Sequence, residues 1–537
     1  MSLDWSYTMK TKYHLSWSHR ILRIIIAVFV TASFLAYSGA AYPLSNAQFE
    51  SFIVQGTSTA QVTQLVERYG GSITSQLEII HGVGALLPAH KLAMLRLEPG
   101  IIAVTPNVPV IATGQRNPST DYPDVVGADV VWNQGNLGEG VTVAVVDTGL
   151  GWHPGFYTNT HGRIDDRVVG WVDFVNGSRI PFDPNGHGTH IGGIIANAQK
   201  DSEGEWNGMA PGVDLVGVRV LDQQGAGTYE RVIEGLQWVL DHQAQYNIKI
   251  INLSLSSPVQ SPYWADPLNQ AVMQAWAAGI TVVVAAGNGG SGPMSVGVPG
   301  NNPYVITVGA FTDNYTPLDW DDDYIAPFSA AGPTLDGFVK PDVVAPGAHM
   351  VAPMMPSSYL ARNHEANKVT ALYFSMAGTS QATAVVSGEA ALILAQHPEL
   401  TPDQVKFRII VTSLLWVDPT TTEALYSMWQ QGAGRVNVPD AVYADISESA
   451  NAGMDIQEDI AGQIHYEGYS YYDDEIGAFR LRSGYGTWSG GYGTWSGNEP
   501  WAGSLFEDPA FVTDYLNGVS PDPGTSSTTI GQWLNEP

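Results

Sequence analysis

The stretch Val141-Thr142-Val143-Ala144-Val145-Val146-Asp147-Thr148-Gly149 decides the fold class of this chain. Its first six residues are apolar or β-branched without polar alternation, which is typical of a strand buried on both faces in a parallel sheet. Two further segments repeat this strand pattern and two others have helical apolar spacing: Ile248 to Leu255 and Ile280 to Ala286, then Tyr229 to His242 and Pro267 to Ala278. The alternation predicts a doubly wound α/β domain over residues 116–445.

Composition restricts the chemistry. The 537 residues include no cysteine, which excludes disulfides, a thiolate nucleophile and cysteine-ligated metals. Lys+Arg 23 against Asp+Glu 52 gives a net charge of −29, which argues against nucleic acid or anionic lipid as a partner. Any hydrolytic nucleophile must therefore be a side-chain oxygen or water.

Residues 1–41 have the order of a secretory signal peptide. Basic residues precede an apolar run from Ile21 to Leu35, and the small residues Ser38-Gly39-Ala40-Ala41 follow it. We therefore expect a secreted protein. The alternative is an uncleaved N-terminal anchor, because the apolar run is only slightly shorter than the roughly 18 to 20 residues that span a bilayer.

Residues 42–115 read as a small α+β unit. Strands are expected at Phe52–Val54, Val83–Leu87 and Ile101–Val104, and helices at Ala60–Tyr69 and Leu92–Leu97. The polar stretch that begins at Gly114 suits a linker or a cleavage site.

Three polar residues stand at the ends of apolar elements. Asp147 ends the buried strand, His187 opens His187-Gly188-Thr189-His190, and Ser380 lies in Gly378-Thr379-Ser380-Gln381-Ala382 before an apolar helix. Strand carboxyl ends and helix amino ends meet at one rim of an open α/β sheet, so these residues are expected to converge. His190 is the rival to His187 on this evidence.

The three side chains match the needs of acyl transfer. A serine hydroxyl needs a base such as His187, and the imidazole needs a carboxylate such as Asp147 to fix its tautomer. The oxyanion that forms needs hydrogen-bond donors. Asn288, just past an apolar strand, is the candidate, together with the backbone N–H of Ser380.

The order Asp, His, Ser with these flanking residues resembles the subtilisin family of serine proteases. Other segments resemble the family as well: Gly208-Met209-Ala210-Pro211-Gly212, Ile251-Asn252-Leu253-Ser254-Leu255, Lys340-Pro341-Asp342-Val343-Val344-Ala345-Pro346-Gly347 and Gln431-Gly432-Ala433-Gly434-Arg435-Val436-Asn437. The resemblance implies a serine endopeptidase that needs no cofactor for catalysis. It also favours His187 over His190, and it implies that residues 42–115 are a propeptide that acts as chaperone and intramolecular inhibitor.

The resemblance also places the substrate. Five residues are expected to line an extended peptide or protein substrate: Ser254, Leu255, Ser256, Ala286 and Gly287. The family usually has glycine where Ser256 stands, methionine where Gln381 stands and proline where Ala384 stands. None of these departures removes a reacting atom, but Ser256 bears on the primary specificity pocket. Broad cleavage after bulky apolar residues by a monomeric enzyme is expected.

Two weaker patterns suggest further binding. The acidic stretch with Asp319, Asp321 and Asp323 suits structural calcium, although acidic loops in an acidic protein are usually only solvated. Residues 446–537 read as an acidic low-complexity tail that contains Gly-Tyr-Gly-Thr-Trp-Ser-Gly twice. Trp488 and Trp495 in this repeat either contact polysaccharide or the cell envelope, or belong to a spacer.

Two other functions compete with the protease. A surface protein can keep such a scaffold without activity, since fold does not guarantee function. The presence of Asp147, His187, Ser380 and Asn288 together argues against that alternative. An acid-acting relative with glutamate in place of histidine is disfavoured by His187 in its full motif.

Overall fold

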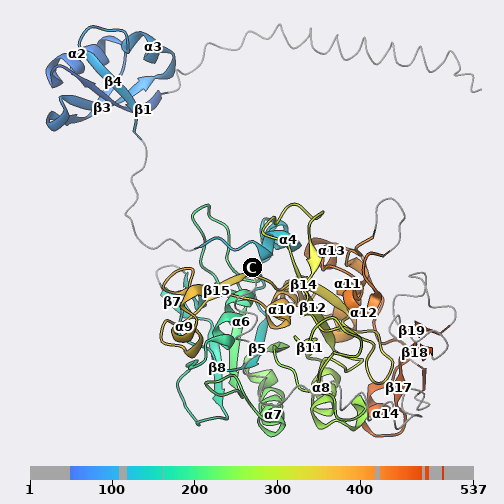
Figure 1. Cartoon of the computed structure of the whole chain (residues 1–537). Coiled ribbons are helices and arrows are strands. Elements are labelled where there is room, and N and C mark those ends of the chain that lie inside the picture. Colours follow the sequence, from blue (N-terminus) through green and yellow to red (C-terminus); the bar gives the residue numbers. More distant parts are fainter. Residues whose placement is uncertain are drawn as a thin grey trace, which may run out of the picture. The chain divides into compact units, whose positions relative to one another are not determined.

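The computed structural model describes residues 49–107, 118–160, 163–417, 424–473, 478–482 and 499–500. The chain divides into two compact units, Met1–Gly114 and Gln115–Pro537, here called unit 1 and unit 2 (Figure 1). No helix among the described residues is long and apolar enough to cross a membrane. The apolar run Ile21 to Leu35 lies outside them.

Unit 1 contains strands and helices, as its sequence predicts, and its strands form a four-stranded antiparallel sheet. Its elements are β1 (Phe49–Gly56), α2 (Thr59–Arg68), β2 (Ser72–Leu77), β3 (Gly82–Pro88), α3 (Leu92–Leu95) and β4 (Ile101–Pro106), with strand order β2-β3-β1-β4. Strand β2 was not expected from the sequence, because this edge strand is polar and mostly exposed. The apolar faces of the other elements form a core of their own around Val54, Val62 and Val83.

The predicted α/β class is confirmed in unit 2. A parallel sheet runs in the order β8 (Val168–Asp173), β9 (Asp214–Arg219), β5 (Thr142–Asp147), β10 (Ile248–Leu253), β11 (Thr281–Ala285) and β12 (Ile306–Thr312). At the far edge β14 (Val343–Pro346) pairs with β12 in parallel and β13 (Tyr324–Ile325) pairs with it antiparallel. Every residue of β5 is buried, which accounts for its continuous apolar sequence.

Two pairs of helices cover this sheet. Helices α6 (His187–Ala196) and α10 (Thr379–Gln396) contact each other, and α7 (Tyr229–Tyr246) and α8 (Pro267–Ala277) form the second pair (Figure 1). Helix α10 is buried from Thr379 to Leu394, and its many Ala, Ser and Gly residues allow close packing on all sides. Its catalytic candidate therefore stands on a rigid element.

The tail does not begin where the sequence predicted. Residues 446–470 belong to unit 2 and pack on its α/β domain through α14 (Ile456–Ile460), which contacts α8. The carboxylate of Asp459, 2% exposed, accepts hydrogen bonds from the hydroxyls of Tyr263 (2.6 Å) and Tyr304 (2.9 Å). Residues 446–470 are therefore not a low-complexity tail. Their sequence is polar, but it includes a buried carboxylate, that of Asp459, which accepts two hydrogen bonds. The seven-residue repeat lies outside the described residues.

The remaining helices and strands are short. They are α4 (Tyr122–Val126), α5 (Ala128–Trp132), β6 (Tyr157–Thr160), β7 (Arg163–Asp166), β15 (Met350–Pro353), α9 (Tyr359–Asn363), β16 (Tyr373–Met376), α11 (Pro402–Thr412), α12 (Met428–Gln431), α13 (Val438–Tyr443), β17 (Tyr466–Glu467), β18 (Ser470–Asp473), β19 (Ala478–Leu481) and β20 (Glu499–Pro500). The hairpin β15–β16 matters for the site, because it leads directly into α10.

Candidate active site

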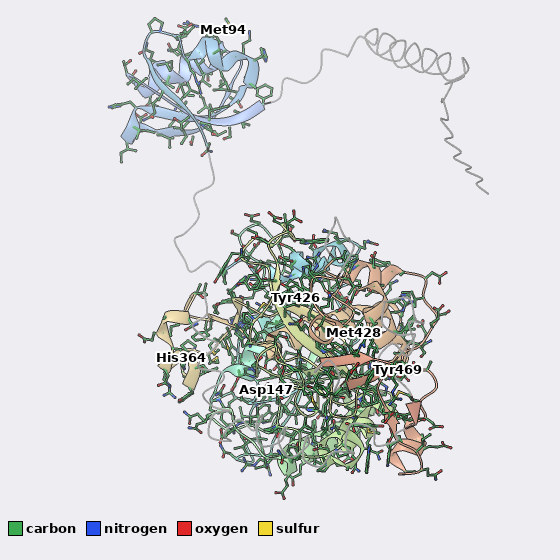
Figure 2. The ribbon with its side chains drawn as sticks, turned by 45° about the vertical axis from the view of Figure 1, so that its right-hand side comes forward. Met94, Asp147, His364, Tyr426, Met428 and Tyr469 are labelled. Atoms are coloured by element: carbon green, nitrogen blue, oxygen red, sulfur yellow. The ribbon has the colours of Figure 1, made fainter. Side chains whose placement is uncertain are left out.

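Asp147 and His187 are in direct contact. Asp147 is the last residue of β5 and is fully buried, deep among the side chains of unit 2 (Figure 2). Its carboxylate oxygens lie 2.8 and 3.0 Å from Nδ1 of His187, the first residue of α6. Burial by itself lowers the pKa of His187, but the charge and hydrogen bond of Asp147 outweigh it and raise the pKa above its ordinary value. The ring is thus held with Nδ1 towards the carboxylate.

His190 is a structural residue. Its ring is fully buried, and Nε2 lies 3.1 Å from the carbonyl oxygens of both Met350 and Phe374, so Nε2 carries the proton. Burial lowers its pKa to about 3, which keeps the imidazole neutral. His190 therefore fastens α6 to the hairpin β15–β16 through Nε2, and its other ring nitrogen, Nδ1, is buried without a hydrogen-bond partner among the described residues.

Asp183 is a positioning residue that the sequence analysis missed. Its buried carboxylate accepts hydrogen bonds from the Thr148 hydroxyl (2.9 Å), from the backbone N–H of Gly186 (2.8 Å) and from the Thr189 hydroxyl (2.7 Å). Thr148 follows Asp147, and Gly186 precedes His187. Asp183 therefore holds the end of β5 against the start of α6, although nothing in its local sequence distinguishes it from a loop aspartate.

Ser380 lies in the first turn of α10 and is fastened to the neighbouring strand. Its carbonyl oxygen accepts a hydrogen bond from the Ser254 hydroxyl (2.9 Å), and its own hydroxyl donates to the carbonyl oxygen of Ser254 (3.2 Å). Asn252 of β10 pairs with Val145 of β5, so Ser254, the first residue after β10, lies at the same end of the sheet as Asp147, the last residue of β5. The structure thus brings Asp147 and His187 together and places Ser380 against Ser254, while the convergence of all three residues remains a prediction. Within the described residues, the Ser380 hydroxyl makes no bond to His187 in this rotamer; unliganded sites often form that bond only with substrate.

Asn288 is oriented beside the start of α10. Its Oδ1 accepts hydrogen bonds from the backbone N–H and the hydroxyl of Thr379, both at 2.9 Å. A Cβ placed on Gly378 would lie 3.3 Å from Nδ2 of Asn288. No acceptor in the described part of the chain takes a hydrogen bond from this Nδ2, nor from the backbone N–H of Ser380. Two donors next to Ser380 are thus free for a ligand.

The residues expected to line the substrate lie on two neighbouring loops. Ser254, Leu255 and Ser256 follow β10, while Ala286 and Gly287 follow β11, which pairs with β10. The hydroxyl of exposed Ser256 lies between two glycines: an added Cβ would stand 3.2 Å from it at Gly287 and 2.2 Å at Gly297. Ser256 therefore narrows the space that these glycines leave open.

The acidic loop is not a ligand cluster. Asp323 accepts a hydrogen bond from Arg435 at 2.8 Å and is nearly buried, whereas Asp319 and Asp321 are exposed. The side chains of Asp319 and Asp321 thus lie in solvent while that of Asp323 lies in an ion pair. The three predicted calcium ligands do not converge on one ion position. Within the described residues, potential metal ligands converge instead at Asp121, Asp313 and His349.

Comparisons with known proteins show the family of the chain. Residues 138–451 match the model of the subtilase family, Peptidase_S8. The chain belongs to the subtilase family. It is 42% identical to the serine protease AprX of Bacillus subtilis over 324 residues, 58% of this chain and 69% of that protein. It is 34% identical to subtilisin DY of Bacillus licheniformis over 319 residues, 59% and 96% of the two chains. A thermostable alkaline protease of Halalkalibacterium halodurans is 30% identical over 414 residues, 77% of this chain and 98% of that protein. This subtilase is accordingly a serine endopeptidase.

Proposed function

We propose that this subtilase is a secreted endopeptidase in which Ser380 is the nucleophile, His187 the general base and acid, and Asp147 the residue that orients His187. The observation that carries the proposal is the buried contact between Nδ1 of His187 and the carboxylate of Asp147. Ser380 is hydrogen-bonded to Ser254 at the same edge of the sheet. Asn288 and the backbone N–H of Ser380 are proposed as the oxyanion hole.

The reaction follows from these positions. Oγ of Ser380 attacks the peptide carbonyl carbon while Nε2 of His187 takes the hydroxyl proton, and Asp147 stabilises the imidazolium. The negative charge on the carbonyl oxygen is met by the two free donors, Nδ2 of Asn288 and the N–H of Ser380. His187 then gives its proton to the leaving amine as the C–N bond breaks. A water molecule then attacks the acyl-enzyme while His187 takes its proton. His187 returns the proton to Oγ of Ser380 as the carboxylic acid product leaves.

The proposal is tested with Ser380→Ala, secreted from a host without other extracellular proteases. Hydrolysis of casein should fall by about 10⁶-fold, the loss that removing the serine causes in subtilisin. If residues 42–115 are a propeptide that the enzyme cuts itself, the variant should also keep unit 1 attached, as intact mass would measure. Casein hydrolysis at the parent rate would contradict the role of Ser380. An inactive variant trimmed like the parent would contradict only self-cleavage.

Ser256 is proposed to set the primary specificity of this enzyme. Its hydroxyl fills part of the gap between Gly287 and Gly297. Ser256→Gly should therefore raise the ratio of kcat/KM for cleavage after tyrosine to kcat/KM for cleavage after leucine. We expect an increase of about tenfold, the size of effect that a small change in pocket volume has on specificity. The matched control is Ser257→Gly, one residue further on. An unchanged ratio in Ser256→Gly, or a preference for Arg or Lys in the parent, would contradict this assignment.

A further inference from the structure

A second cluster of ligating side chains lies outside the proposed active site. Asp121 directly precedes α4, Asp313 directly follows β12, and His349 directly precedes β15. One ligand atom from each side chain lies within 4.8 Å of the other two. Nε2 of His349 is 2.5 Å from Oδ1 of Asp313, and the ring of His349 stacks on Tyr315 with centroids 3.9 Å apart. Three segments far apart in sequence thus direct these groups to one point.

Within the part of the chain that the structure describes, two buried polar atoms of the cluster have no hydrogen-bond partner. The Asp313 side chain is only 4% exposed, and its second oxygen, Oδ2, has no hydrogen-bond partner. Nδ1 of His349, on a side chain 8% exposed, is also buried without one. Such atoms are costly in a protein interior unless an ion or water completes them. The unpaired oxygen belongs to the same carboxylate that contacts His349.

The charges in the cluster are also unbalanced. The cluster brings two carboxyl groups and one imidazole together, so the acidic groups outnumber the basic group. In the portion of the chain that the structure describes, no lysine or arginine forms an ion pair with Asp121 or Asp313. The nearby Arg435 is paired with Asp323. A divalent cation would balance both carboxylates.

We infer that Asp121, Asp313 and His349 form a binding site for a divalent transition metal, with Zn²⁺ as the best match. Calcium and magnesium take oxygen ligands, whereas an imidazole beside carboxylates suits zinc and its neighbours. Three protein ligands with water in a fourth position make a tetrahedral zinc site. The inference does not depend on which residues perform catalysis.

The position of the site indicates that the metal would stabilise the fold. Asp121 lies six residues after the proposed propeptide end at 115, so the metal ties the beginning of the mature domain to the sheet. The residue after His349 is Met350, whose carbonyl oxygen holds His190 in α6. Metal binding therefore fixes the hairpin β15–β16, which runs on to Ser380, and it should stabilise the mature domain by favouring the folded state.

The test uses the whole secreted chain with Ser380→Ala, which prevents self-digestion. After removal of metal with a chelator, binding of Zn²⁺, Mn²⁺ and Ca²⁺ is measured separately by calorimetry, and Co²⁺ is added as a spectroscopic probe. We expect one tightly bound Zn²⁺ per chain and an intense visible Co²⁺ spectrum of tetrahedral type. Asp313→Asn and His349→Gln should each weaken Zn²⁺ binding by about 100-fold or more, because the loss of outer-shell partners already costs 10- to 100-fold.

The matched control is Asp319→Asn, the same change on an exposed residue of the neighbouring loop, which should bind like the parent. Circular dichroism verifies that each variant is folded, and Asp121→Asn replaces any variant that is not. Absence of a stoichiometric Zn²⁺ site would overturn the inference, as would Zn²⁺ binding that persists in Asp313→Asn and His349→Gln. Tight binding of Ca²⁺ in preference to Zn²⁺ at these residues would overturn the metal class.

Discussion

Individual residues at the candidate site gain their properties from partners that are remote in sequence. Asp147 and His187 were predicted from their motifs, and their contact explains why the pKa of His187 is raised despite burial. Asp183 could not be predicted, because its role depends on donors that only the folded loop brings to it. Likewise, the sequence grouped Asp323 with Asp319 and Asp321 as calcium ligands. In the folded chain Asp323 forms an ion pair with Arg435 instead.

The raised pKa of His187 has a measurable consequence. The base must be neutral to act, so kcat/KM should rise with pH through a midpoint above the ordinary value of about 6.5 and stay high beyond it. Asp147→Asn removes the interaction that raises the pKa, so the midpoint should move down and kcat should fall by about 10⁴-fold. The exposed control Asp241→Asn should leave the profile unchanged. A midpoint below 6 in the parent, or an unshifted midpoint in Asp147→Asn, would contradict the coupling.

At the scale of elements, burial decided what the sequence could predict. Strands β5, β10 and β11 are buried on both faces, so their continuous apolar runs were recognisable. Strand β2 was not, because its side chains mostly face solvent. Helix α14 escaped prediction for another reason. It is only five residues long, and its Asp459 accepts hydrogen bonds from Tyr263 and Tyr304 that no local pattern indicates.

The packed segment after residue 445 should be needed for stability. A chain that ends at 445 loses the buried rings of Tyr466 and Tyr469 together with the Asp459 centre. Large apolar side chains contribute about 1.5–3 kcal/mol each when buried, so unit 2 should lose at least about 3 kcal/mol. Urea unfolding of Ser380→Ala chains that end at 445 and at 482 measures the difference. Equal stability of the two chains would mean that residues 446–482 are a dispensable tail.

At the scale of the whole molecule, the two units have separate cores. The division into a propeptide and an enzyme remains a prediction. The boundary at Gly114 coincides with the polar stretch expected to be a linker or a cleavage site. Secretion and the role of Trp488 and Trp495 remain predictions, because the residues concerned lie outside the described ranges. The metal site proposed above could not have been predicted from the sequence, since its three ligands come from separate elements and, unlike Asp147, His187 and Ser380, lie in no recognisable motif.

The central claim is that Ser380 is the nucleophile, and covalent labelling tests it most directly. An aryl sulfonyl fluoride transfers its sulfonyl group to an activated serine oxygen with loss of fluoride. The account predicts loss of activity with one label per chain, located on Ser380 by peptide mass analysis, and no label in Ser380→Ala. It also predicts much slower labelling in Asp147→Asn, whose His187 is no longer oriented. Stoichiometric labelling of another serine, or full inactivation without a label on Ser380, would contradict the account.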